Sequence, residues 1–163
     1  MTNTHDLVPF LKNAIVHYLD RSGRLLDIII RHPKAADLLA TKLAPDGFDT
    51  GFHLAVGMQF AARAVCFPVG APVPEIVEPY GAESLKALHQ DVLAAVQNAP
   101  PIDWSHEITH TAGRASLLQS AADYVIRFAY PNMLFHLSQA YAGLRLAGMD
   151  ISKEDFDGLH KYR

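Results

Sequence analysis

Charged residues, cysteines and long uninterrupted apolar runs are all scarce in this sequence. Charged residues make up 19% of the 163 positions and the net charge is -3, so no basic excess is present to neutralise phosphates, and nucleic-acid binding is not expected. The single cysteine, Cys66, excludes an internal disulfide. The most apolar stretch, residues 54–73, is interrupted by Arg63 and by glycines and prolines, so we expect no membrane-spanning segment.

Length and composition predict one globular domain. Half of the residues are apolar, which is too many for a disordered chain and ordinary for a compact one. A chain of this length can bury about two-thirds of the surface that its unfolded form exposes. The first residues, MTNTHDLVPFLK, lack the basic and apolar segments of a secretory signal. We therefore expect a single cytoplasmic domain over residues 1–163.

Apolar residues recur at helical spacing in four long segments, each of which is stopped by proline or glycine. Between the second and third segments, four prolines within residues 68–79 predict an extended connection that crosses along the molecule. This pattern predicts an all-α, up-and-down four-helix bundle with a proline-rich crossover. The predicted helices cover residues 7–29, 49–67, 85–96 and 120–146.

Two local features are predicted near the last helix. Residues 104–118 alternate around the turn-like sequence TAGR, which fits either a short hairpin or a plain loop. Pro131 lies inside the last helix and cannot donate a hydrogen bond to the carbonyl of Arg127, so a kink is expected there. The kink would fall one residue before Asn132.

Polar and small residues share the inward face of the second predicted helix. His53 lies one turn after Asp49 and one turn before Gly57. A glycine at this place costs about 1 kcal/mol of helix stability relative to alanine, so something must approach the backbone closely. That neighbour can be a ligand or a closely packed helix.

The last helix carries a matching polar stripe. Asn132 and His136 are one turn apart on one face, and Gln139 follows them. Two histidines at this spacing would form an ordinary metal clamp, but the first position holds an asparagine. The amide oxygen of asparagine is a weak, neutral metal ligand, which suits hard cations better than zinc or nickel.

These motifs resemble a known group of proteins. His136-x-x-Gln139 followed by LRLAG is similar to the last helix of the DinB/YfiT-like superfamily, where a His-x-x-x-His-x-x-Gln run leads into Leu-Arg and a closing glycine. The first histidine of that run is Asn132 here, and FDTGFHLA resembles the helix that carries the third metal-binding histidine, at His53. The segments KLAPDGF, FAARAV and FAYPNMLFHLSQAYAGLR resemble an uncharacterised bacterial family within the superfamily, a domain of unknown function.

The resemblance implies a four-helix bundle, usually a homodimer, with a divalent metal such as zinc or nickel held by three histidines. Some members of the superfamily are implied to be thiol-dependent transferases or isomerases. Carried onto this sequence, the ligand positions are His53 and His136, with Asn132 at the third. The pocket around them would include Asp49, Gly57 and Gln139.

Two functional hypotheses of different classes follow. In the first, the pocket is a degenerate divalent-metal site that supports thiol-dependent transferase or isomerase chemistry. In the second, the protein is a non-catalytic binder of a small molecule, or an interaction protein, and the former metal site is a hydrogen-bond network without a cofactor. The sequence leaves open whether the protein is an enzyme.

Several residues outside the pocket receive simpler interpretations. Cys66 is expected to be a small buried hydrophobe, because nothing in the sequence supplies a base to activate it. Arg63 is expected to pair with an acidic side chain rather than to bind an acidic ligand. His17 is expected at the boundary of the first helix, and His110 is expected to be solvated.

Overall fold

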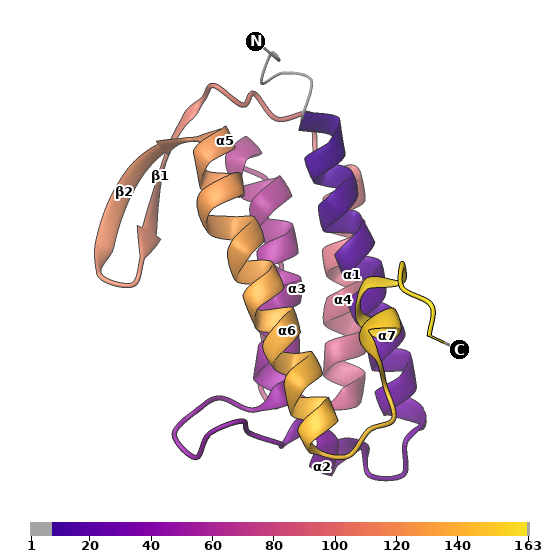
Figure 1. Ribbon diagram of the computed structural model, residues 1–163. Coiled ribbons are helices and arrows are strands. Elements are labelled where there is room, and N and C mark those ends of the chain that lie inside the picture. Colours follow the sequence, from indigo (N-terminus) through magenta and orange to yellow (C-terminus); the bar gives the residue numbers. More distant parts are fainter. Residues whose placement is uncertain (1–7, 163) are drawn as a thin grey trace.

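Four long helices form the body of the protein in a computed structural model that describes residues 8–162 (Figure 1). Each buries an apolar stripe against the others, as the helical periodicity of the sequence predicts. Leu7, where the first helix was expected to begin, lies outside the described residues. The long helices are α1 (Val8–Arg31), α3 (Thr50–Cys66), α4 (Ala82–Asn98) and α6 (Tyr130–Leu146).

Shorter elements connect and extend these helices. Of the two alternatives for residues 104–118, the structure has the hairpin, which runs from Glu107 to Ser120, and Gly113 takes the positive φ of 60° that its turn requires. Sequence periodicity did not reveal the two short helices α2 and α7, because five residues are too few to show a helical stripe. The shorter elements are α2 (Ala35–Leu39), a 3-10 turn (Phe67–Val69), β1 (Glu107–Ala112), β2 (Ala115–Ser120), α5 (Ala121–Tyr124), a π-helical turn (Val125–Ala129) and α7 (Lys153–Asp157).

The proline-rich connection returns the chain along the length of the bundle, as predicted. Tyr80, two residues before α4, packs so closely on Gly51 at the start of α3 that a Cβ added there would lie 2.9 Å from the Tyr80 carbonyl oxygen. Helices α3 and α4 therefore begin at the same end and run parallel, while α1 and α6 run the other way (Figure 1). The expected up-and-down alternation holds for α1–α3 and α4–α6 but not for α3–α4.

Helix α3 is the most deeply buried of the long helices. Together with the 3-10 turn it forms a segment, Thr50–Val69, that is long and apolar enough to cross a membrane by length and composition alone. Since 61% of this segment is buried inside the protein, packing in the core accounts for its apolar character. Cys66, the last residue of α3, is fully buried, and burial raises the pKa of its thiol. The prediction of a small buried hydrophobe is confirmed.

The last long helix contains a change of register at the place where the proline kink was expected. The π-helical turn ends one residue before α6, and Pro131 lies in the first turn of α6. A π turn bonds residues five apart, so the helix shifts register just before the residue that lacks an N–H. Gly148, at a φ of 88°, closes the helix as predicted.

The C-terminal segment packs back onto α1. Arg21 donates hydrogen bonds from its guanidinium to the carbonyl oxygens of Glu154 and Asp155, at 3.0 and 2.7 Å. The Nε2 atom of His17 lies 2.7 Å from the carbonyl oxygen of Asp157. His17 is therefore a half-buried residue that holds α7, which agrees with its expected boundary position and separates it from the polar residues of α3 and α6.

Candidate functional site

Two histidines from α3 and α6 meet at the centre of the candidate site. The Nδ1 atoms of His53 and His136 are 3.0 Å apart, and the ring centroids are 5.1 Å apart at an angle of 40°. Both side chains are half-buried. The sequence prediction that these two residues lie close together is confirmed.

Aromatic rings surround the histidine pair. The ring of Phe60 stacks on His136 at a centroid distance of 6.0 Å, and Phe52 and Phe135 contact the pair edge-on. Phe48 stacks on Phe52 at 3.9 Å. Phe48 and Phe135 are 61% and 53% exposed, so the outer side of this frame is open to solvent. The sequence contained a signal for it, because Phe52 and Phe135 directly precede the two histidines.

Burial keeps both imidazoles neutral. Burial and, to a smaller extent, the neighbouring His53 together lower the pKa of His136 to about 4. Burial also lowers the pKa of His53, although the Asp49 carboxylate opposes that shift. Two neutral imidazoles that share a hydrogen bond between their Nδ1 atoms must be opposite tautomers. One ring then carries a hydrogen-bond donor at Nε2, and the other carries an acceptor.

The two Nε2 atoms are available to a ligand. Within residues 8–162 neither of them has a hydrogen-bond partner in the protein. In the same part of the chain, the buried side-chain nitrogen and oxygen atoms that lack a partner belong only to Arg21 and His110. The Nε2 atoms of His53 and His136 therefore retain contact with solvent.

Asn132 uses its amide to stabilise the backbone. Its Nδ2 donates a hydrogen bond of 2.8 Å to the carbonyl oxygen of Phe128, which belongs to the π-helical turn. The side chain thus satisfies a carbonyl where the helix changes register. An imidazole at this position could not reproduce the same amide geometry. This contact gives a structural reason for an asparagine one turn before His136.

The other expected pocket residues support the helices. Asp49 caps α3 by accepting a 2.7 Å hydrogen bond from the backbone N–H of Phe52. A Cβ on Gly57 would lie 2.7 Å from Cδ2 of Leu137, so this glycine allows α3 and α6 to pack closely. Gln139 is half-buried and forms no side-chain hydrogen bond with the described residues.

The residues present fit only part of a metal site. Within residues 8–162, no group of three histidine, cysteine, aspartate or glutamate side chains could hold a metal ion. Two nitrogens that bind one tetrahedral zinc lie about 3.3 Å apart, given Zn–N distances of about 2.0–2.1 Å. The observed 3.0 Å between the Nδ1 atoms is close to that spacing. This spacing is compatible with two ligands on one ion, but the residues present do not fit a three-histidine centre.

The free energy of unfolding is expected to fall as the pH is lowered from about 6.5 to about 4. Between these values the unfolded chain protonates residue 136 and the folded chain does not, so acid favours the unfolded state. Because the ring is partly exposed to solvent, we expect a loss of about 1–2 kcal/mol. Urea unfolding at pH 7 and pH 4.5 measures it. His136→Phe should reduce this dependence on pH, and the control His106→Phe, on an exposed loop, should not. If the free energy of unfolding changes equally with pH in the wild type and both variants, His136 is not the group responsible.

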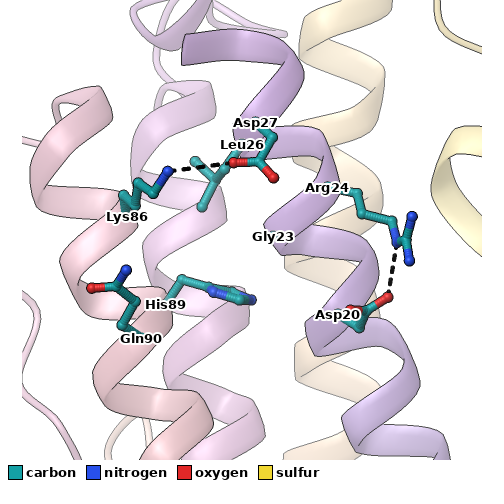
Figure 2. A pocket seen from close by; sticks show the side chains of 8 residues that line it. All are labelled: Asp20, Gly23, Arg24, Leu26, Asp27, Lys86, His89 and Gln90. Atoms are coloured by element: carbon teal, nitrogen blue, oxygen red, sulfur yellow. Dashed lines mark hydrogen bonds and ion pairs between the residues drawn. The ribbon is translucent and has the colours of Figure 1, made fainter.

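A groove between α1 and α4 is a poorer candidate. It has a volume of about 360 Å³, and Figure 2 shows the side chains that line it. Its charges are paired, with 3.0 Å between Arg24 and Asp20 and 3.6 Å between Lys86 and Asp27. His89 lies 3.0 Å from the carbonyl oxygen of Leu19. Among the polar side chains that line this groove, only Gln90 has no such partner within residues 8–162, and one amide is a weak basis for recognising a ligand.

Comparisons with known proteins agree with this architecture. A family model described as a domain of unknown function (DUF1993) matches residues 11–157. The crystal structure of a DinB family member protein from Shewanella denitrificans matches with a TM-score of 0.76 and 20% sequence identity, over 99% of this chain and 98% of that one. No curated protein matches the chain. At this identity the structural match establishes the fold alone.

Proposed function

We propose that this chain, which belongs to the DUF1993 family of unknown function and has a DinB-like fold, is a ligand-binding protein. The ligand is a small polar molecule that binds to His53 and His136. The observation that carries this proposal is the 3.0 Å contact between the two Nδ1 atoms. It joins the rings into one unit whose Nε2 atoms offer a donor and an acceptor. The two Nε2 atoms lie on the far sides of the joined rings, so a primary carboxamide can engage one of them at a time, with its carbonyl as acceptor or its NH₂ as donor.

The surroundings of the pair favour a ligand with an apolar part. Phe52, Phe60 and Phe135 contact the imidazoles, and they can cover an aromatic or aliphatic group next to the carboxamide. Asn132 and Asp49 act on the backbone in this proposal, not on the ligand. The protein is then a binding protein without a resident metal.

Benzamide is a suitable probe for this site. We expect NMR titration to shift the imidazole resonances of His53 and His136, and ¹⁵N shifts to show opposite tautomers before addition. His136→Phe keeps a ring of similar shape but removes the nitrogens, so it should abolish the effect. Benzylamine, which lacks the carbonyl acceptor, should bind more weakly. Identical tautomers, or benzamide binding that survives His136→Phe, would disprove the proposal.

A second candidate is metal-assisted thiol chemistry, for which the spacing of the Nδ1 atoms is the favourable observation. His53 and His136 would supply two ligands for zinc or nickel, and a thiol substrate would have to provide another, since Asn132 donates to Phe128. Metal analysis of protein purified without a histidine tag separates the two candidates. About one equivalent of zinc or nickel would favour this one, and metal-free protein would favour simple ligand binding.

We also propose that the protein is a cytoplasmic homodimer that associates through α6. Phe135 and Leu146 are 53% and 63% exposed, and they lie eleven residues apart, which places them on one face of the helix. Leu146→Asp would put like charges into a symmetric interface. Sedimentation at micromolar concentration should show a wild-type dimer and a Leu146→Asp monomer. Leu118→Asp, at an exposed site on β2, should remain dimeric; a wild-type monomer would contradict the proposal.

A further inference from the structure

A second cavity lies between the C-terminal half of α3, the hairpin and the proline-rich connection. Its volume of about 450 Å³ is within the range of about 300–1,000 Å³ that is usual for small-molecule sites. It is separate from the histidine pair, because Arg63 in its wall follows His53 by ten residues, or roughly 15 Å along α3. The side chains that matter here belong to Arg63, Phe67, Glu75, His110, Tyr124 and Phe128.

Arg63 is a half-buried cation that forms no ion pair with residues 8–162, contrary to the sequence expectation. Among the described residues no carboxylate lies within 4.0 Å of its guanidinium, although Glu75 lines the same cavity. Its Cζ atom is 5.3 Å from the centroid of the Phe60 ring, a cation–π contact that stabilises the positive charge in part. The ring accepts no conventional hydrogen bond from the guanidinium. The planar donor group of this arginine therefore remains free for an anion.

His110 is buried, where the sequence predicted a solvated residue. It is 6% exposed, because β1 turns it towards the bundle and its ring packs on Tyr124 and Phe128 at centroid distances of 4.8 and 4.5 Å. Its Nε2 is 2.6 Å from Oε1 of Gln119. Its Nδ1 is buried without a partner in residues 8–162, an uncommon condition that is found at functional sites.

Tyr124 brings a hydroxyl to the same cavity. Its side chain is only 2% exposed, and burial raises its pKa to about 12, so the hydroxyl remains a donor at neutral pH. Residues 8–162 offer this hydroxyl no hydrogen-bond partner. The fully buried polar atoms that lack a partner belong to other residues, so the hydroxyl oxygen is not fully buried. It therefore retains accessible surface where Tyr124 lines the cavity.

We propose that this cavity is a second ligand site that binds a small monocarboxylate with an apolar or aromatic body. Arg63 holds the carboxylate, and the hydroxyl of Tyr124 donates to it. The rings of Phe67 and Phe128 cover the apolar body. Glu75 at the rim repels a second negative charge, so it selects against dicarboxylates. The groove of Figure 2 differs because its basic side chains are already paired with aspartates.

The probe for this site is 3-phenylpropionate, titrated into ¹⁵N-labelled protein. We expect shifts at the amides of Thr109, His110 and Thr111, which border the cavity. Arg63→Gln should weaken binding by about ten- to a hundred-fold, the usual effect of losing a hydrogen bond to a charged group. Glu75→Gln should strengthen binding, because it removes a like charge. These opposite signs separate carboxylate recognition from nonspecific apolar binding.

Two controls keep the result interpretable. Tyr124→Phe retains the buried ring and should weaken binding several-fold, which tests the site even if Arg63→Gln folds poorly. His136→Phe removes the first site and should leave 3-phenylpropionate binding unchanged, so the two proposals fail independently. The proposal is overturned if 3-phenylpropionate does not bind at millimolar concentration, if Arg63→Gln binds it equally well, or if phenethylamine binds more tightly.

Discussion

Asn132→His is expected to raise the affinity for zinc or nickel by orders of magnitude. The new imidazole would lie one turn from His136, on the face where His53 already meets it, which completes three nitrogen ligands. Zinc would replace the hydrogen bond between the two Nδ1 atoms, and their spacing need increase by only a few tenths of an ångström. At a zinc concentration of about a hundred times Kd, the folded state should gain about 2.7 kcal/mol. Thermal unfolding with and without zinc measures this gain.

The same substitution removes the hydrogen bond from Asn132 to Phe128. Without metal, we therefore expect the variant to lose about 1–3 kcal/mol of stability. Asn132→Leu should show this loss without any response to zinc. Ser138→His places an exposed imidazole on the same helix and controls for adventitious binding. If Asn132→His loses stability and gains none from zinc, the asparagine has a purely structural role and the metal hypothesis should be dropped.

Gly57→Val is expected to destabilise the protein by about 3 kcal/mol, because α3 and α6 cannot move apart without losing their shared core. Its first added carbon would lie 2.7 Å from Cδ2 and 2.9 Å from Cγ of Leu137. A chain of this length should then melt about 6–12 °C lower. Calorimetry of the wild type and the variant measures the change.

Two further variants identify the cause. Ala87→Val introduces the same β-branched side chain at an exposed position of α4 and should cost less than about 1 kcal/mol. Leu137→Ala should cost about 2–5 kcal/mol alone. The double variant Gly57→Val, Leu137→Ala should lose at least about 1 kcal/mol less than the sum of the single losses, because the smaller side chain makes room. Additive losses would mean that the two residues do not compete for space.

Sequence periodicity determined which segments are helical and which faces point inward. Apolar spacing and the positions of proline and glycine predicted the four long helices and the crossover, because both are local properties of the chain. The meeting of His53 and His136 followed from their inward positions together with the family resemblance. These features need no knowledge of the exact distance between helices.

Only the tertiary structure decided which atoms become partners across the bundle. The π-helical turn set the carbonyl of Phe128 against the amide of Asn132, and close packing placed Leu137 on Gly57. In the same way, the fold buried His110 and left Arg63 with no carboxylate of residues 8–162 within 4.0 Å. Each outcome depends on helix register and on separations of a few ångströms between distant segments. Hydrogen bonds and ion pairs are that sensitive to distance, whereas an apolar stripe tolerates such shifts, so local sequence patterns predict the stripe but not the partners.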